Sequence, residues 1–158
     1  LGPLAQYSGF KTIQKQLADA EEKGAIITRH PGPFPDGENY LLPAILTKVN
    51  HNMDIMMEES FGPVVGIMPV KSDIEAIDLM NDSPYGLTAS VWTRDAKKAI
   101  EIGNQIETGT FYMNRCDVLD PTLPWVGVKD SGKGCTLSAL GLQQLTRPKA
   151  FNLKVATY

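Results

Sequence analysis

The sequence predicts an α/β fold, namely a mostly parallel β-α-β-α-β sheet flanked by helices and followed by a terminal strand. Apolar runs of strand length occur at residues 64–70, 88–92 and 110–114, and segments with helical periodicity separate them. Strands that alternate with helices form parallel sheets through right-handed crossovers. The 158 residues, 42% hydrophobic and 21% charged, are enough for one globular domain with a core.

The N-terminal region is expected to hold one helix and two strand-like segments. Residues 10–20 place their apolar side chains on one helical face, and Gly24 can adopt the left-handed conformation that ends a helix. A short β-branched strand at 25–28 follows, and then a loop rich in proline and glycine. Pro43 interrupts the extended segment 40–49, which we therefore expect at a sheet edge or as an irregular crossing.

The central region gives the clearest signals. Residues 64–70 fit a strand that is buried on both faces. Ser72 and Glu75 have the S-x-x-E spacing of a capping box, in which each side chain satisfies an unpaired amide at a helix start. Turn-forming residues at 81–86 end this helix. Its buried face is expected to consist of Ile74, Ile77 and Met80.

A second strand, a second helix and a third strand follow. Residues 88–92 are typical of a strand, Asp95 can cap the next helix, and Gly109 ends that helix before the strand at 110–114. Ligands of such sheets lie beyond the carboxyl ends of the strands, so the segments that follow the three strands are candidate site segments. The apolar face of the second helix is expected to comprise Ala96, Ala99, Ile100, Gly103 and Ile106.

The C-terminal region is rich in loops as far as Gly134, with a short helix expected at 137–145. Phe151, Leu153 and Val155 then alternate with polar residues, which is the pattern of a strand with one solvated face. An unpaired strand of this kind is an aggregation hazard, so we expect this strand to have a partner.

Charge and composition exclude several classes of function. The 15 Lys and Arg residues against 18 Asp and Glu give a net charge of −3, and the lack of basic clusters disfavours a nucleic-acid surface. No apolar run approaches the roughly 20 residues that span a bilayer, and no signal-peptide pattern opens the sequence. We therefore expect a soluble, cytoplasmic protein with no nucleic-acid or membrane partner and with reduced cysteines.

Candidates for nucleophile, base and metal ligand are few. His30 and His51 lie in or beside loops and are better interpreted as solvated side chains than as catalytic bases. Cys116 and Cys135 lack the spacing of metal ligands, and neither a Walker loop nor a G-x-G-x-x-G motif follows a strand. No catalytic residue and no metal ligand is therefore assigned.

The segment 58–64, Glu-Glu-Ser-Phe-Gly-Pro-Val, has side chains suited to a nucleoside. The carboxylate of Glu59 can accept two hydrogen bonds from a vicinal diol, and Phe61, two residues further on, lies on the same side of an extended segment. A ribose carrying a flat heterocycle would suit this pair. The alternative is that both acids are merely solvated at the end of a loop.

Four segments, in this order and spacing, resemble the C-terminal half of the NAD(P)-dependent aldehyde dehydrogenase superfamily: EESFGPV, PYGL, ETGTFYMN and PWVGVKDSGKG. These oxidoreductases oxidise aldehydes to carboxylic acids with hydride transfer to NAD(P)+, so the resemblance implies NAD or NADP as cofactor and an aldehyde as substrate. It implies that Glu59 contacts the nicotinamide ribose hydroxyls and that Phe61 packs beside the nicotinamide ring. It also implies that Asp117, Leu119 and Trp125 line the aldehyde tunnel, although plain core packing is the alternative for Trp125.

The same resemblance implies a division of the chain. Residues 1–149 correspond to the C-terminal portion of a catalytic domain, and residues 150–158 to a terminal oligomerisation strand that pairs with another subunit, so we expect a homo-oligomer. In the family the nucleophilic cysteine and the general-base glutamate precede the segment that resembles Gly2-Pro3-Leu4. We therefore expect a C-terminal fragment, inactive alone, whose partner is the missing N-terminal part of the same enzyme. Thr136 stands where relatives usually carry a glutamate.

Two alternatives stay open. The chain could be a non-catalytic α/β interaction module that reuses the fold, or a small α/β protein that binds a nucleotide weakly. The start at Leu1, not methionine, favours a piece of a longer enzyme. Cys116, which the resemblance places beside the tunnel, is disfavoured as a replacement nucleophile because it has Arg115 on one side and Asp117 on the other.

Overall fold

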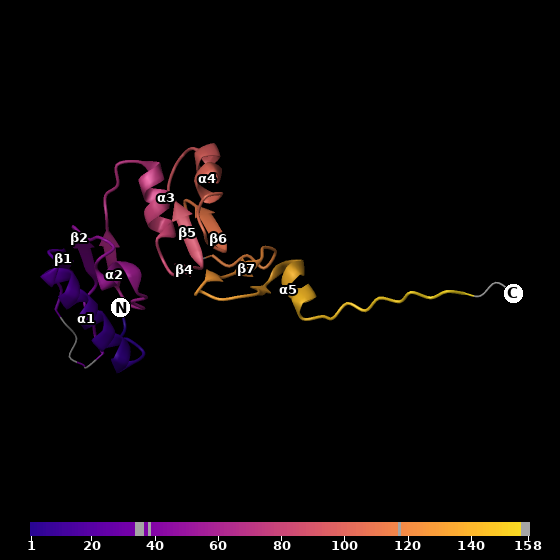
Figure 1. Ribbon diagram of the computed structural model, residues 1–158. Coiled ribbons are helices and arrows are strands. Elements are labelled where there is room, and N and C mark those ends of the chain that lie inside the picture. The colour runs from indigo at the N-terminus through magenta and orange to yellow at the C-terminus, as the bar shows by residue number, and fades with distance from the viewer. Residues whose placement is uncertain (34–36, 38, 117, 156–158) are drawn as a thin grey trace. The chain divides into compact units, whose positions relative to one another are not determined.

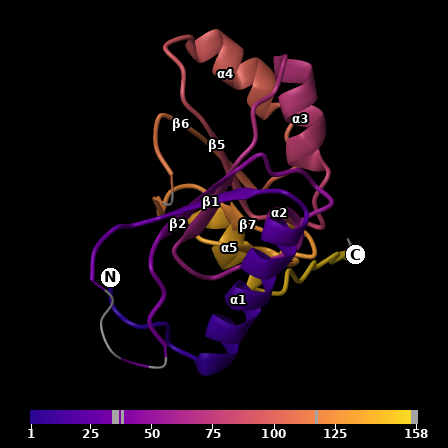
Figure 2. The same cartoon turned by 90° about the vertical axis from the view of Figure 1, so that its left-hand side faces the viewer.

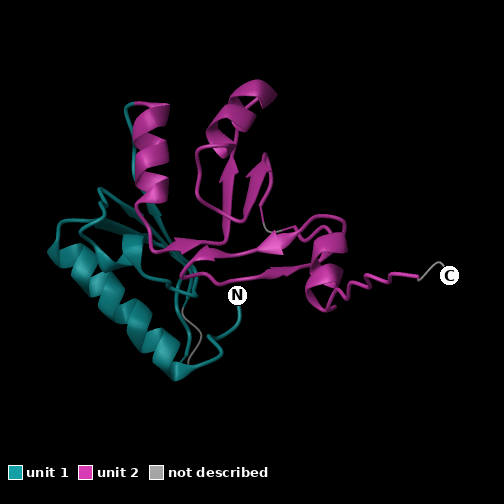
Figure 3. Cartoon of the chain, turned by 45° about the vertical axis from the view of Figure 1, so that its right-hand side comes forward, with its two compact units in different colours: residues 1–71 teal, residues 72–158 magenta. Residues whose placement is uncertain are grey.

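The computed structural model describes residues 1–33, 37, 39–116 and 118–155 (Figure 1). The chain forms two compact units, unit 1 with residues 1–71 and unit 2 with residues 72–158 (Figure 3). Each unit is described by itself. None of the described helices is both long and apolar enough to span a membrane.

Unit 1 combines one long helix, one short helix and three strands. The predicted first helix and the predicted strand after it are confirmed, and Gly24 has the left-handed φ of 93° that releases the chain from the helix. The short helix that follows the second strand was not expected. In order, the elements are α1 (Tyr7–Glu22), β1 (Ile26–Arg29), β2 (Ala44–Thr47), α2 (Asp54–Met57) and β3 (Val64–Ile67).

The strands of unit 1 form one mixed sheet in the order β1-β2-β3. β2 is antiparallel to β1 and parallel to β3, so it is the central strand and the expected edge position for residues 40–49 is wrong. Pro43 is tolerated because it precedes the strand, where its carbonyl accepts a hydrogen bond from the amide of His30 at 3.0 Å. The core of the unit packs α1 and α2 against β2, with Ile13 and Leu46 fully buried.

β3 is shorter and more exposed than the sequence indicates. The strand ends at Ile67, and its burial alternates, so that Val65 and Ile67 are about half exposed (54% and 51%). The expectation of burial on both faces is therefore wrong within unit 1, because the core cluster of this unit packs on one face of the sheet.

Unit 2 holds three helices and six short strands among its described residues. The Ser72 cap and the Asp95 cap are confirmed: the Ser72 hydroxyl accepts from the amide of Glu75 at 3.2 Å, and the Asp95 carboxylate accepts from the amide of Lys98 at 3.0 Å. The reciprocal bond to the Glu75 carboxylate stays a prediction. The elements are α3 (Asp73–Asn81), β4 (Tyr85–Gly86), β5 (Thr88–Val91), α4 (Ala96–Gly103), β6 (Thr110–Met113), β7 (Trp125–Val126), β8 (Val128–Lys129), β9 (Cys135–Thr136) and α5 (Ser138–Gln144).

The α/β class is confirmed, but the strands are divided among more sheets than expected. β5 and β6 form a parallel pair, as predicted, whereas β3 pairs with β2 in unit 1. Two antiparallel pairs, β4 with β8 and β7 with β9, occupy the region that the sequence indicates to be loops. Strands of two residues are too short to show any periodicity, so their pattern could not be detected.

The buried faces of the two central helices are narrower than predicted. Ile77 is buried, but Ile74 is 71% and Met80 39% exposed, and on α4 Ala99 is buried while Ile100 is 65% exposed. α4 also ends at Gly103, well before Gly109.

The segment after α5 forms no strand among its described residues, and Figure 1 shows it as a run without secondary structure. Phe151, Leu153 and Val155 are 73%, 81% and 85% exposed. A strand needs a hydrogen-bonded neighbour, and this segment has none within the described chain. The oligomerisation strand therefore stays a prediction, as does the division of the chain at residues 149 and 150.

Candidate functional site

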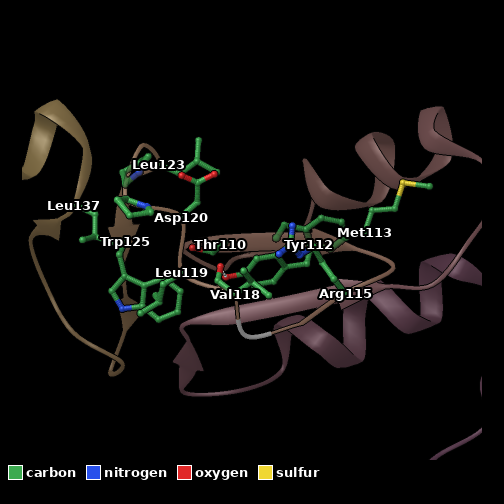
Figure 4. Close-up of a pocket in the computed structure, with 13 residues that line it drawn as sticks. Thr110, Tyr112, Met113, Arg115, Val118, Leu119, Asp120, Leu123, Trp125 and Leu137 are labelled. Carbon is green, nitrogen blue, oxygen red and sulfur yellow. Dashed lines mark hydrogen bonds between the residues drawn. The ribbon is translucent and has the colours of Figure 1, made fainter.

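A cavity of about 370 Å³ lies in unit 2 (Figure 4). Its wall is formed by β6, by the segment that follows β6 up to Pro124, by Trp125 of β7 and by Leu137. The cavity thus runs along a parallel strand and extends past its carboxyl end, which is the end where ligands of α/β sheets bind. Figure 4 shows Trp125 and Met113 at opposite ends of the group of side chains.

The predicted tunnel residues Leu119 and Trp125 both line this cavity. Asp117, the third predicted residue, lies outside the described residues. The lining is otherwise mainly apolar and aromatic, with Phe111 and Tyr112 from β6. Sequence reasoning did not identify these two aromatic residues, although their place in the strand before the expected site was the available signal.

Side-chain hydrogen bonds of Tyr112 and Asn114 hold the segment that forms the cavity wall. The Tyr112 hydroxyl donates to the carbonyl of Val118 at 2.8 Å, which ties the segment back to β6. Asn114, with a left-handed φ of 55°, accepts from the amide of Thr93 at 2.8 Å and donates to its carbonyl at 2.7 Å. Asparagine tolerates this backbone conformation better than most residues, so its position at the end of β6 has a structural cause.

Among the described lining residues, Arg115 and Asp120 are charged. The hydroxyl and the amide of Thr122 donate to the Asp120 carboxylate at 2.7 and 2.9 Å. These two bonds, with a smaller contribution from the positive charge of Arg115, lower the pKa of Asp120 below its ordinary value of 3.8. Asp120 therefore stays ionised at neutral pH, and the described lining of the cavity carries one charge of each sign.

The Lys129 ammonium connects β8 to three residues from other segments of unit 2. It donates to the carbonyls of Asn81 at 2.7 Å and Ser83 at 3.1 Å and forms an ion pair with Glu107 at 2.9 Å. The Lys129 side chain is only 23% exposed, so these bonds are partly shielded from water. Three of the resembling segments, PYGL, ETGTFYMN and PWVGVKDSGKG, meet here: β4 pairs with β8, and the Ser131 hydroxyl accepts from the amide of Gly86 at 3.0 Å.

Close backbone contact explains one of the glycines in these segments. A Cβ atom on Gly109 would overlap the carbonyl group of Val126. The start of β6 therefore lies directly against β7, and any side chain at this position would push apart the strand segments that carry Thr110 and Trp125 to the cavity.

Glu59 and Phe61 lie in unit 1, where both are exposed and Phe61 retains 84% of its accessible surface. Phe61 has a left-handed φ of 47°, and Gly62 lies so close to Ile13 that a Cβ atom would overlap the Ile13 side chain. The turn that presents the phenyl ring is thus packed onto α1. The expectation of an extended segment is wrong at Phe61, because its left-handed φ turns the chain there. An open carboxylate and an uncovered ring are the kinds of group that a ribose diol and a flat heterocycle need, and the nicotinamide assignment of both residues stays a prediction.

Nucleophilic and metal-binding groups give no second site in the described residues. Cys116 is exposed and Cys135 half buried, and both are free thiols. The Nδ1 atom of His30 accepts a hydrogen bond from the amide of Gly32 at 3.0 Å. No group of three or more His, Cys, Asp or Glu side chains in the described part of the chain could hold a metal ion.

The fold and the cavity define an α/β protein with a largely apolar, aromatic-lined ligand cavity beside a parallel strand pair. The model of the aldehyde dehydrogenase family matches residues 1–151. The chain belongs to this family.

The relatives are longer than this chain. An aldehyde dehydrogenase from Paenarthrobacter nicotinovorans is 42% identical over 149 residues, which cover 94% of this chain and 32% of that enzyme. The chain spans about a third of the length of the curated relatives that it matches.

Solved structures of family members agree with the fold. The structure of a Mycobacterium tuberculosis aldehyde dehydrogenase complexed with NAD+ is similar with a TM-score of 0.85 and 34% identity, over 97% of this chain and 33% of that one. The structure of an NADP-dependent glyceraldehyde-3-phosphate dehydrogenase from Bacillus halodurans complexed with NADP has a TM-score of 0.77 and 38% identity, over 84% and 28%. The family thus includes users of either nicotinamide cofactor.

Proposed function

We propose that this chain forms about a third of an NAD(P)-dependent aldehyde dehydrogenase that oxidises aldehydes to carboxylic acids. The observation that supports this most is the cavity of unit 2, because its wall combines the predicted tunnel residues Leu119 and Trp125 with residues from two segments that resemble the family, ETGTFYMN and PWVGVKDSGKG. When bound, NAD(P)+ supplies the hydride acceptor for the aldehyde carbon. The chain's own residues bind and orient the two reactants.

Glu59 and Phe61 would hold the nicotinamide end of the cofactor. The Glu59 carboxylate accepts hydrogen bonds from the two ribose hydroxyls, and the exposed Phe61 ring covers one side of the nicotinamide. Because neither contact involves the adenosine end, where a 2′-phosphate distinguishes the two cofactors, the proposal covers NAD and NADP equally.

The cavity would bind the aldehyde. Leu119 and Trp125 would form part of the tunnel wall, and the aromatic residues of β6 would complete an apolar lining that excludes water from the substrate body. Asp117, which lies outside the described residues, is proposed for the same wall on the resemblance alone. The buried hydroxyl oxygen of Thr110, which also lines the cavity, has no hydrogen-bond partner in the described chain and is available to a ligand. An aldehyde with an apolar body suits these walls best.

Catalysis would need groups from the rest of the enzyme. Cys116 is exposed, and no hydrogen bond joins it to a base among the residues that the structure describes, so the chain is proposed to be inactive alone. The partners proposed are the remaining part of the same polypeptide and, through residues 150–158, further subunits of a homo-oligomer.

The test replaces the matched segment of the P. nicotinovorans enzyme with residues 1–151 of this chain and measures aldehyde-dependent reduction of NAD+ and NADP+. We expect an active chimaera. The substitution Glu59→Gln should raise the KM for the cofactor about 10- to 100-fold, because a hydrogen bond to a charged group contributes about 1.5–3 kcal/mol and each 1.4 kcal/mol is tenfold.

Glu58→Gln is the matched control, since it removes the neighbouring exposed carboxylate and should leave the KM unchanged. A folded but inactive chimaera, or equal effects of the two substitutions, would contradict the proposal. The isolated chain should reduce no cofactor with any aldehyde, and activity that Cys116→Ala abolishes would show that it carries its own nucleophile.

A further inference from the structure

Arg115 lines the cavity of unit 2 just past the end of β6. It follows Asn114, which comes directly after the last residue of that strand, and it is exposed. Among the described residues, no hydrogen bond, ion pair or aromatic ring engages its guanidinium group. A guanidinium presents several N–H donors in a rigid planar fork, so these donors are open to a ligand in the cavity.

Asp120, the acidic residue of the same lining, does not neutralise Arg115. Both bonds from Thr122 go to one oxygen of the Asp120 carboxylate. Within the described chain no ion pair joins the two charged residues, and Figure 4 shows them apart, with Asp120 towards Leu123 and Arg115 towards Met113. Arg115 accordingly makes the smallest of the contributions that lower the pKa of Asp120. The cavity therefore contains a separate positive spot.

The wall around this spot is suited to a hydrocarbon chain. Val118, Leu119, Leu123 and Trp125 give the cavity apolar surface, and its volume of about 370 Å³ is that of a site for a small molecule. Arg115 is the single cation of the described lining. A carboxylate brings one negative charge and two oxygens that match the guanidinium fork, whereas a phosphate monoester brings nearly two charges and would leave part of its charge unpaired.

We propose that Arg115 is a specificity-determining residue that selects aldehydes with a carboxylate at the end of the chain remote from the aldehyde group, that is, the semialdehydes of dicarboxylic acids. The guanidinium binds the carboxylate, and Leu119 and Trp125 contact the hydrocarbon between the two ends. Arg115 binds and orients the substrate and takes no part in the oxidation. The inference rests on the proposed function and adds a substrate class to it.

The experiment compares adipic semialdehyde with its methyl ester as substrates of the chimaera described above, because the two aldehydes differ in charge but not in chain length. Arg115→Gln should lower kcat/KM for the acid about 3- to 10-fold, mainly through KM, and change the value for the ester less than about twofold. Arg115→Lys keeps the charge without the fork and should lie in between. Arg94→Gln is the matched control, since it removes an exposed arginine outside the cavity lining and should leave both aldehydes unaffected.

Three results would overturn the inference. An equal loss for acid and ester in Arg115→Gln would mean that the side chain supports the cavity wall instead of binding a carboxylate. An equal effect of Arg94→Gln would mean that only the net charge of the protein matters. Higher kcat/KM for glyceraldehyde 3-phosphate than for adipic semialdehyde, lost in Arg115→Gln, would identify a phosphate as the group that Arg115 binds.

A binding measurement separates this inference from the proposed function. Hexanoate and hexanamide are titrated into this chain, and the tryptophan fluorescence is followed because Trp125 lines the cavity. Hexanoate should act at about 3- to 10-fold lower concentration than hexanamide, and Arg115→Gln should abolish the difference. A chimaera that oxidises no aldehyde would refute the proposed function, and the carboxylate preference of this chain would still stand. Equal titrations of the two compounds in the unsubstituted chain would overturn the inference.

Discussion

The two units are stabilised in different ways. In unit 1, where α1 and α2 lie beside β1 and β2 (Figure 2), the largest fully buried side chains are Ile13, Leu46 and Met53, and they belong to one apolar cluster. In the described part of unit 2 the buried apolar residues are Ile77, Ala99 and Ile106, which are smaller or scattered. Side-chain hydrogen bonds from polar residues join its short strands and turns instead.

The Asn81 side chain illustrates how unit 2 is joined. It donates to the carbonyl of Gln105 at 2.7 Å and accepts from the amide of Glu107 at 2.9 Å, and so holds the end of α3 to the segment between α4 and β6. Such a clamp makes up for a small core because each bond is directional and fixes one loop against another. The segments that resemble the family are concentrated in this clamped unit, so the resemblance reflects a polar frame more than an apolar core.

The largest expected effect on the free energy of unfolding comes from removing a core side chain of unit 1. Leu46→Ala should destabilise unit 1 by about 2–5 kcal/mol, because Leu46 is fully buried and the substitution leaves a cavity. Urea unfolding followed by circular dichroism measures the change. Both tryptophans, Trp92 and Trp125, lie in unit 2, so the midpoint of the tryptophan fluorescence should stay where it is.

Ile45→Ala is the matched control, since Ile45 precedes Leu46 on β2 and lies on the opposite, half-exposed face. It should cost distinctly less than Leu46→Ala. If the fluorescence midpoint shifts together with the dichroism, the two units unfold as one cooperative body and the contrast drawn between them is wrong.

The second largest expected effect on stability comes from removing the Lys129 ammonium, which joins segments of unit 2 by hydrogen bonds. Lys129→Met keeps the length and apolar stem of the side chain but removes the ammonium donor from the carbonyls of Asn81 and Ser83, which should cost about 1–3 kcal/mol. The Asn81 carbonyl keeps one bond, from the amide of Ser83. The left-handed φ of 53° at position 129 is equally unfavourable for both residues and cancels from the comparison. Here the tryptophan fluorescence should shift, and the signal of unit 1 should not.

Glu107→Gln separates the role of the ion pair from that of the two carbonyls. The Glu107 side chain is 63% exposed, so its charge contributes little and this variant should be close to wild type. If instead Glu107→Gln is as destabilising as Lys129→Met, the ion pair and not the carbonyl bonds holds this region together.

The sequence was informative wherever local rules decide the structure. The helix at 10–20, its stop at Gly24 and the caps Ser72 and Asp95 depend on contacts within one helical turn, and all four predictions are confirmed. The end of α4 was misjudged because a distant side chain, Asn81, holds the following turn in place. No local pattern carries that information.

The same distinction applies to the candidate site. Leu119 and Trp125 were identified through resemblance, and the structure places both in one cavity, whereas the two charged residues Arg115 and Asp120 were missed as cavity residues. Their proximity depends on the path of a loop, which neither periodicity nor capping rules determine. The exposure of β3 was missed for another reason: an apolar strand has the same sequence pattern whether or not a covering layer is present.

The smallest expected effect is on acid stability, and each unit contains one carboxylate that can show it. In unit 1 the Asp19 carboxylate forms an ion pair with Lys23 at 2.6 Å and accepts from the amide of Asp54 at 3.0 Å, so it ties α1 to α2. The hydrogen bond from Lys23, followed by that from Asp54, lowers the pKa of Asp19 below its ordinary value of 3.8.

A folded-state pKa below the unfolded value means that the ionised carboxylate stabilises unit 1 above the unfolded value of 3.8, and that this contribution is lost as the pH falls through the folded pKa. Asp19→Asn should therefore be less stable near neutral pH and lose less stability between about pH 6 and pH 3 than the wild type does. The urea midpoint from circular dichroism, followed against pH, measures the stability of unit 1.

Asp120→Asn, which removes the carboxylate bound by Thr122, should instead flatten the acid response of the tryptophan signal, which reports on unit 2. If Asp19→Asn leaves the acid response of the dichroism unchanged, other carboxylates determine the acid stability of unit 1. If either variant changes both the dichroism and the tryptophan signal, the two units do not unfold independently.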